Sequence, residues 1–310
     1  MNTLHVVTPT FKSKRLQLLT QKNIFLKMDC FQPVGSFKIR GIGHLCQDLV
    51  KKGCQHLVAS SGGNAGYAVA YAANKLNVPA TIFVPKTTNH IFLARLKEEG
   101  ATVNIAGDVW DEAHFAAMRF VQEINAGYVP PFDHPLIWEG HMSIVDEIHA
   151  QCPKPDAIVV AVGGGGLACG ILQGLEKHHW SDIPLFAVET QGSASFAATK
   201  KAGELISLDK INTIATSLGA KTVTKELVRW MNKQEVNSLV VSDKDAILAC
   251  KQFVDDHRAL VEPSCGAALS VVYQIEKFPE LTEKNNILVI VCGGIGISLE
   301  LMEQHIKALV

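Results

Sequence analysis

The sequence has no excess of charge of either sign. The chain has twenty-nine basic and thirty acidic residues, which leaves a formal net charge of −1. Charged residues make up only 19% of the 310 residues. Without a positive field, the chain has nothing that would collect nucleic-acid phosphates or anionic lipid. Its 47% hydrophobic content is also far from that of disordered chains. We therefore expect a globular protein with no nucleic-acid or membrane partner.

Long apolar runs and Cys-x-x-Cys pairs are also missing. The longest uncharged stretches, 54–74 and 157–175, are broken by glycine clusters and polar residues, which a membrane-spanning helix would not need. The N-terminal segment has basic residues but no apolar stretch typical of a secretory signal. The eight cysteines are widely spaced, which is typical of free thiols in a reducing compartment. A cytoplasmic location is expected.

Short apolar runs alternate with longer segments of helical period, and this pattern predicts an α/β protein with open twisted sheets flanked by helices. The expected strands are 24–28, 56–59, 80–84, 102–105, 157–162, 185–188 and 287–291. The expected helices are 36–50, 65–76, 90–99, 110–124, 141–149, 166–177, 244–256, 265–277 and 298–309. The proline-rich segment 129–135 indicates a crossover between two lobes. We expect a small domain over 38–135 and a larger one over 1–37 and 136–310.

Three glycine-rich turns follow predicted strands and precede predicted helices, at 60–66, 163–167 and 292–296. In an open parallel sheet such turns collect at the carboxyl edge, where ligands bind. Four consecutive glycines cost backbone entropy, so Gly163 to Gly166 favour main chain wrapped around an anion such as a phosphate over a turn that merely tolerates glycine. The same segment also imitates a dinucleotide-binding fingerprint, with Glu189 as its acidic residue, so a nicotinamide oxidoreductase remains an alternative.

Lys38 is the candidate nucleophile. The segment Gly35-Ser36-Phe37-Lys38 places this lysine beside an aromatic ring in the first turn of a predicted helix. Burial and the positive end of the helix would both lower the pKa of its ammonium group. A lysine that is partly neutral can form a Schiff base.

Six motifs in this order resemble those of the serine/threonine dehydratases, and the resemblance covers nearly the whole chain. They are Gly35-Ser36-Phe37-Lys38, Ser61-Gly62-Gly63-Asn64-Ala65-Gly66, the four glycines, Val188-Glu189-Thr190, Glu262-Pro263-Ser264-Cys265-Gly266-Ala267-Ala268 and Val291-Cys292-Gly293-Gly294. These enzymes use pyridoxal phosphate and have the tryptophan-synthase-β-like fold. The resemblance is closest to the L-serine dehydratase branch, which has cysteine at position 292. Two departures are Gly62, where that branch often has alanine, and Ile295-Gly296, where a more polar pair is usual.

The resemblance implies roles for these residues toward the cofactor. Lys38 would hold pyridoxal phosphate covalently and later remove the Cα proton of the substrate. Phe37 would pack against the cofactor ring and Asn64 would bind the ring hydroxyl. The phosphate would lie on the large domain, on the amides of Gly163, Gly164, Gly165, Gly166 and Leu167.

The resemblance also implies a substrate loop on the small domain and a cation site. The substrate carboxylate would bind to Ser61, Gly62, Gly63, Asn64 and Ala65. Because glycine leaves this loop loose, alanine at position 62 is expected to lower the KM for serine. Glu189 and Ser193 resemble the ligands of a monovalent cation, for which K+ is the expected ion.

Cys292 bears on the type of reaction, because the resemblance places it at the nitrogen of the cofactor ring. A thiol is a poor counter-ion for a pyridinium, so this nitrogen should stay neutral and the ring should be a weak electron sink. Such a site suits β-elimination better than transamination.

The expected function is dehydration of L-serine, and of L-threonine, to pyruvate or 2-oxobutyrate and ammonia. The alternatives are a β-replacement enzyme similar to cysteine synthase, or a sensor that binds without turnover. The family resemblance favours a homodimer. The chain ends soon after the last motif, so we expect a catabolic enzyme without inhibition by isoleucine.

Overall fold

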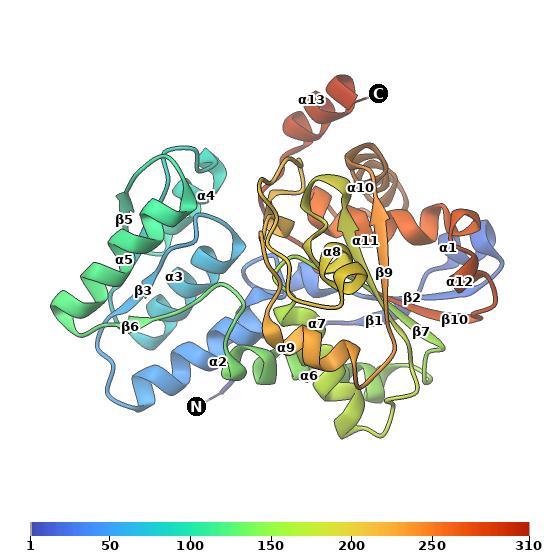
Figure 1. The fold of residues 1–310 in the computed structure, drawn as a ribbon, viewed down its shortest axis with the longest axis horizontal. Helices are drawn as coiled ribbons and strands as arrows, with labels where there is room; N and C mark the ends of the chain where they lie inside the picture. The colour runs from blue at the N-terminus through green and yellow to red at the C-terminus, as the bar shows by residue number, and fades with distance from the viewer. Residues whose placement is uncertain (1, 310) are drawn as a thin grey trace.

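The computed structural model describes residues 2–309 and contains two separate β-sheets (Figure 1). The larger sheet has the strand order β1-β2-β10-β7-β8-β9, and every neighbouring pair is parallel except β1 with β2. Its strands are β1 (Thr10–Lys12), β2 (Asn23–Lys27), β10 (Asn286–Ile290), β7 (Ala157–Ala161), β8 (Leu185–Thr190) and β9 (Val236–Val241). The chain therefore places β2, from its N-terminal part, directly beside its last strand β10.

The smaller sheet is formed entirely by the segment between β2 and α6. Its order is β5-β4-β3-β6 and all pairs are parallel. The strands are β3 (Leu57–Ala59), β4 (Ala80–Val84), β5 (Thr102–Ile105) and β6 (Gly127–Tyr128). Together the two parallel sheets with flanking helices confirm the predicted α/β class.

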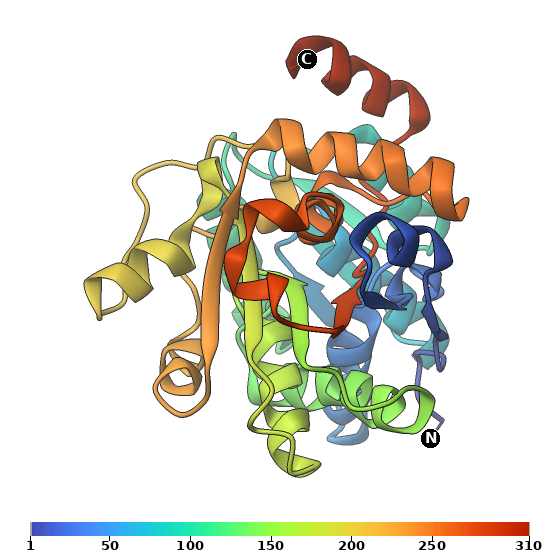
Figure 2. The ribbon, with the colours of Figure 1, turned by 90° about the vertical axis from the view of Figure 1, so that its right-hand side faces the viewer.

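Helices cover both sheets (Figures 1 and 2). The small sheet is accompanied by α2 (Lys38–Lys51), α3 (Asn64–Leu76), α4 (His90–Glu98) and α5 (Trp110–Ile124), and α2 also packs against α6 of the large lobe. The large sheet is accompanied by α1 (Lys14–Thr20), α6 (Pro135–Gln151), α7 (Gly166–Lys177), α8 (Ser195–Ala202), α9 (Lys225–Met231), α10 (Asp243–His257), α11 (Pro263–Tyr273), α12 (Pro279–Thr282) and α13 (Leu299–Leu309).

The seven predicted strands are all present, but the prediction missed β1, β6 and β9. These are either very short or, as in β9, edge strands whose apolar run is interrupted by Asn237 and Ser238. The predicted start of α6 at residue 141 is wrong. The helix begins at Pro135, because proline suits the first helical position and the His134 side chain accepts the Leu136 N–H at 3.1 Å. The prediction also missed the short helices α1, α8, α9 and α12.

A buried ionic cluster ties the N-terminal segment to α2 and α6. The Arg40 guanidinium is fully buried and donates to both carboxylate oxygens of Asp29, at 2.7 and 2.8 Å, and to Glu147. Lys27, also fully buried, donates to Glu147 and to the Thr8 carbonyl. Because each buried charge has an opposite partner, the cluster holds the start of α2 firmly against the large lobe. Lys38 begins this same helix.

Candidate active site

The three glycine turns lie at the carboxyl ends of β3, β7 and β10, and the last of them is joined to the segment before Lys38. The Phe37 N–H donates to the Cys292 carbonyl at 3.0 Å, and the Gly294 N–H donates to the Gly35 carbonyl at 2.8 Å. These hydrogen bonds bring residues about 250 positions apart in the sequence into one isolated bridge, formed by Ser36 and Gly293. The start of α2 is thereby fixed at the edge of the large sheet.

Lys38 lies in the first turn of α2, as predicted, although the helix begins at Lys38 itself rather than at the predicted residue 36. Its Nζ donates to the Pro131 carbonyl at 2.6 Å and lies 5.2 Å from the centre of the Phe37 ring. The residue is half-buried, and desolvation lowers the pKa of its ammonium group to about 8, although the nearby Cys292 and Glu262 act to raise it. Near neutral pH, a larger fraction of this lysine is therefore uncharged and nucleophilic than of an ordinary lysine.

Cys292 follows β10 and faces the same region as Lys38. Interaction with the Cys265 thiol, together with burial, raises the pKa of Cys292 well above its ordinary value. The sulfur is therefore a protonated thiol rather than a thiolate. All eight cysteines are free.

Asn64 begins α3 and connects the small-sheet loop to the large lobe. Its amide nitrogen donates to the Glu262 carboxylate at 2.9 Å and to the Ser217 hydroxyl at 3.1 Å, and its amide oxygen accepts the Ile295 N–H at 3.1 Å. Glu262 is 4% exposed and also accepts the Gly296 N–H at 3.2 Å. Burial raises the pKa of Glu262, while its hydrogen bonds oppose this rise.

The segment from Ser61 to Ala65 runs from the end of β3 into α3. Gly66 is required in the first turn of the helix, because a Cβ there would lie 1.8 Å from the Ser61 carbonyl oxygen. The Gly63 N–H lies 3.4 Å from Ser61 Oγ, within hydrogen-bonding distance. A side chain at Gly62 would point at Thr88, which lies in the turn between β4 and α4.

The four glycines form the turn between β7 and α7, and Gly165 has a φ of +89°. A Cβ at Gly164 would lie 2.4 Å from the Phe132 ring, and a Cβ at Gly163 would lie 3.0 Å from Leu218. Within residues 2–309, the backbone N–H groups of Gly163 to Gly166 donate no hydrogen bond to the protein. A tight main-chain turn with free amides at the start of a twelve-residue helix fits a phosphate group.

These features fit pyridoxal phosphate, because a partly neutral lysine, a phosphate-type turn and a protonated thiol meet at one edge of the large sheet. Phe37 belongs to the same group, and its ring packs on His141 at a centroid distance of 5.0 Å. His141 is fully buried, and neither ring nitrogen finds a hydrogen-bond partner in the described part of the chain. Burial lowers the pKa of His141 well below its usual value, so the ring is neutral.

Glu189 and Ser193 lie at the end of β8, but their side chains have different hydrogen-bond partners. The buried carboxylate of Glu189 accepts the N–H groups of Phe196 and Ala197 at 2.7 and 2.8 Å, so it caps α8. Burial raises its pKa to about 7, against the effect of these amides. Ser193 is hydrogen-bonded to the Thr190 hydroxyl at 2.8 Å.

Four residues that the sequence analysis did not assign to the site contact the predicted ones: Glu262, Ser217, Phe132 and Thr88. Glu262 stands in a motif already quoted for the family, and a carboxylate directly before a buried helix was the available signal. Ser217 lies in a short 3-10 helix (Thr216–Leu218), Phe132 and Thr88 lie in loops, and none of these segments has a recognisable spacing. Only the tertiary structure brings them to Asn64, Gly164 and Gly62.

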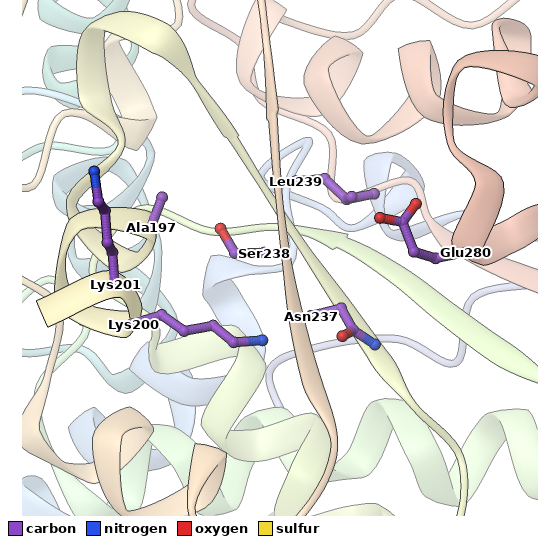
Figure 3. Close-up of a pocket in the computed structure, with 7 residues that line it drawn as sticks. All are labelled: Ala197, Lys200, Lys201, Asn237, Ser238, Leu239 and Glu280. Carbon is purple, nitrogen blue, oxygen red and sulfur yellow. The ribbon is translucent and has the colours of Figure 1, made fainter. Parts of the chain in front are cut away.

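Other surface features lie apart from these residues. A shallow hollow beside β9 is lined by Lys200, Lys201, Ser238 and Glu280, among others, and none of its lining residues belongs to the predicted site (Figure 3). Among residues 2–309, no three His, Cys, Asp or Glu side chains are grouped so that they could hold a metal ion. In the same described range, no helix combines the length and apolar character needed to cross a membrane.

The fold and the site define a pyridoxal-phosphate enzyme, and the comparison with known families agrees. The chain belongs to the family described as pyridoxal-phosphate dependent enzymes, whose model matches residues 1–293. This match confirms pyridoxal phosphate as the cofactor and decides against the nicotinamide alternative for the glycine turn at 163.

Individual relatives narrow the comparison to serine dehydratases. The chain is 50% identical over 305 residues to human L-serine dehydratase/L-threonine deaminase, covering 96% of this chain and 93% of the relative. It is 47% identical over 315 residues to the human serine dehydratase-like protein, with 97% and 95% covered. The resemblance to the serine/threonine dehydratases, predicted from six motifs, is thereby confirmed.

Solved structures agree with the sequence relatives. A fungal L-serine ammonia-lyase from Rhizomucor miehei is similar over 100% of both chains, with a TM-score of 0.95 and 40% identity. Maize serine racemase is similar with a TM-score of 0.90 and 27% identity, covering 98% of this chain and 92% of the other. The two-lobed arrangement of parallel sheets is therefore that of these enzymes.

Proposed function

We propose that this protein is an L-serine dehydratase that also acts on L-threonine. It converts serine to pyruvate and ammonia, and threonine to 2-oxobutyrate and ammonia. The observation that carries this proposal is the placement of Lys38, with its pKa of about 8, beside the Cys292 thiol at the carboxyl edge of the large sheet. Identity of 50% to the human serine dehydratase supports it along nearly the whole chain.

Bound pyridoxal phosphate would supply an electron sink that acidifies the Cα–H bond of the substrate. Lys38 would hold it through Nζ, Phe37 would support its ring, Asn64 would bind the ring hydroxyl, and the amides of Gly163 to Leu167 would bind its phosphate. The neutral Lys38 amine would then take up the Cα proton. Its lowered pKa suits this task, because a general base works best when its pKa is close to the working pH.

The loop from Ser61 to Ala65 would hold the substrate carboxylate with its hydroxyl and backbone N–H groups. The carboxylate is thereby oriented and kept away from the reacting bond. Cys292, as a protonated thiol, would donate to the ring nitrogen without giving it a full positive charge. Such a ring stores little negative charge, so loss of the hydroxide from Cβ is favoured over reactions that need a long-lived carbanion.

The proposal also covers the domain boundaries, a cation site, the oligomer and the cellular location. We assign 38–135 to a small domain that carries the substrate loop, and 1–37 with 136–310 to a large domain that binds the cofactor. Glu189 and Ser193 would contribute to a site for a monovalent cation such as K+, with the Glu189 carboxylate shared between the cation and α8. A homodimer in the cytoplasm is proposed, and the free thiols are compatible with a reducing compartment.

Keto-acid release coupled to lactate dehydrogenase tests the proposal. Purified protein supplied with pyridoxal phosphate should consume NADH when serine or threonine is added, without any second nucleophile. Adding sulfide separates dehydration from β-replacement, because a β-replacement enzyme would convert serine and sulfide to cysteine and water and would release no keto acid. Cysteine formed only when sulfide is present, without keto acid, would show a β-replacement enzyme, and spectroscopic binding of serine without either product would show a sensor.

A further inference from the structure

Three polar side chains meet directly behind the substrate loop, and the proposed mechanism does not use them. Ser60 Oγ lies 2.8 Å from Tyr128 Oη and 3.2 Å from His114 Nδ1, and Tyr128 Oη lies 3.0 Å from the same nitrogen. Each of the three atoms is therefore within hydrogen-bonding distance of the other two. We refer to Ser60, His114 and Tyr128 as the Ser60 triangle.

The triangle connects the loop to two separate elements of the small sheet. Ser60 is 1% exposed and stands between β3 and Ser61, the first residue of the loop. Tyr128 lies on β6, which pairs with β3 so that Val58 and Tyr128 are opposite each other. His114 comes from α5, which packs on β3 and β6 (Figure 1). Any shift of Ser60 therefore has to break contacts to both a strand and a helix.

The His114 ring is itself fixed. Trp110, one helical turn earlier on α5, stacks on it with ring centroids 4.8 Å apart and an interplanar angle of 6°. The ring also meets the Tyr128 ring edge-on at 5.4 Å. These contacts hold Nδ1 where the two hydroxyl groups can reach it. A side chain with stacked neighbours and one directed nitrogen is suited to orient a hydroxyl.

The two hydroxyl groups and the histidine nitrogen have enough donors and acceptors to form two hydrogen bonds at once. Ser60 and Tyr128 bring one hydroxyl proton each, and neutral histidine offers Nδ1 as an acceptor when Nε2 carries its proton. Tyr128 can then donate to Nδ1 while Ser60 donates to the Tyr128 oxygen. Both hydroxyl protons are used, and the Ser60 side chain is left with one direction. Phenylalanine at position 114 would keep the stacking but remove the acceptor.

We propose that His114 is a positioning residue for the substrate carboxylate, acting through Tyr128 and Ser60 on the loop at 61–65. The inference rests on the proposed function of that loop. A fixed Ser60 preorganises the loop in the free enzyme, so less conformational entropy is lost when the carboxylate binds. Loss of the triangle should therefore weaken binding of the amino acid and leave the chemical step, which depends on Lys38, nearly unchanged.

The test compares His114→Phe, Tyr128→Phe and the double variant as holoenzymes, with Phe115→Ala as the control. Phe115 lies on the same helix and is 66% exposed, so it measures the effect of altering α5 without touching the triangle. KM and kcat for serine are measured first. A titration with L-alanine then follows the cofactor absorption band, because alanine has the carboxylate and amino group of serine but no leaving group. This second measurement reports binding without turnover.

Each single variant is expected to raise both the KM for serine and the Kd for alanine by about five- to tenfold, with kcat within twofold of wild type. The double variant should be no worse than the more severe single variant, because the three residues act as one unit. His114→Asn, whose amide oxygen can replace Nδ1, should recover part of the affinity. The Phe115→Ala control should match wild type.

Two results would overturn the inference while the proposed function stands. In the first result the wild-type enzyme deaminates serine, but the KM for serine and the Kd for alanine of both single variants stay within twofold of the wild-type values. The other is a fall in kcat of similar size in both single variants with an unchanged KM. This result would mean that His114 acts in the chemical step or in the overall stability of the protein. If Tyr128→Phe alone is folded, it decides the question, because it removes only one hydroxyl group. A wild-type protein that does not deaminate serine would instead reject the proposed function.

Discussion

Thr88 occupies the space into which a side chain at Gly62 would project. A Cβ built on Gly62 would lie 2.6 Å from Thr88 Oγ1 and 2.7 Å from Thr88 Cγ2. The threonine is held in place, because its hydroxyl donates to the Pro85 carbonyl at 2.8 Å. Glycine at position 62 therefore accommodates a neighbour as well as loosening the loop.

This contact reverses the effect of alanine at position 62 that was expected from the sequence. We now expect Gly62→Ala to raise the KM for serine several-fold, because the methyl group pushes the loop away from the turn that contains Thr88. The double variant Gly62→Ala/Thr88→Ala removes both clashing atoms and should return the KM to or below the wild-type value. Steady-state kinetics of the two variants and of Thr88→Ala alone measure this. A lower KM in the single variant would show that Thr88 moves aside freely.

Lys38→Ala should abolish both the visible cofactor band and turnover. The substitution removes the amine that would hold the cofactor and take up the Cα proton. Absorption spectra and the keto-acid assay detect the two losses separately. Lys51→Ala, at the other end of α2, is the matched control and should behave as wild type. Normal activity in Lys38→Ala would reject the assignment of this site.

The lowered pKa of Lys38 should be visible in the pH dependence of cofactor loading. Only the neutral amine attacks an aldehyde, so the loading rate of the apoenzyme should rise about tenfold per pH unit below the lysine pKa and level off above it. With burial lowering this pKa to about 8, the plateau should begin near pH 8. An ordinary lysine would give a rate that still rises toward pH 10. Stopped-flow absorption between pH 6.5 and about 9.5 distinguishes the two cases.

Gly164→Ala should weaken binding of the cofactor. Its Cβ would lie 2.4 Å from three atoms of the Phe132 ring, so either the ring or the turn has to move. Overpacking of this kind costs about 1–3 kcal/mol, which corresponds to roughly a five- to 150-fold higher Kd. Equilibrium titration of the apoenzyme with pyridoxal phosphate measures the change. Gly164→Ala combined with Phe132→Leu should bind more tightly than the single variant if the clash is the cause.

Asp29→Asn should destabilise the fold without altering the reaction. It leaves the Arg40 charge buried and partly unpaired, and breaking a buried pair costs about 3–5 kcal/mol. Burial acts to raise the pKa of Asp29, but Arg40 and Thr8 hold it below its usual value. Its contribution to stability is thus present above pH of about 4 and is lost as the pH falls further. Urea unfolding at pH 7 should show the loss, while Asp182→Asn, from an exposed pair with Lys154, should cost about 0–1 kcal/mol.

Much of the fold was predictable because its signals are local. Buried strands such as β7 and β10 are short runs of Val and Ile, and the helices after the glycine turns have clear apolar periodicity. β9 was missed because an edge strand is only partly buried and its sequence alternates weakly. The start of α6 was missed because it is set by Pro135 and the His134 cap rather than by apolar spacing.

The sequence by itself determined the chemical groups of this protein: Lys38 at a helix start, Cys292 after a buried strand and an unbroken run of glycines. Only the tertiary structure decided which groups accompany them. Glu262 reaches Asn64, Thr88 faces Gly62, and His114 and Tyr128 meet at Ser60 because separate strands and helices converge there. The physical reason is that hydrogen bonds and steric contacts act over a few ångströms in space, while composition and periodicity report only on neighbours along the chain.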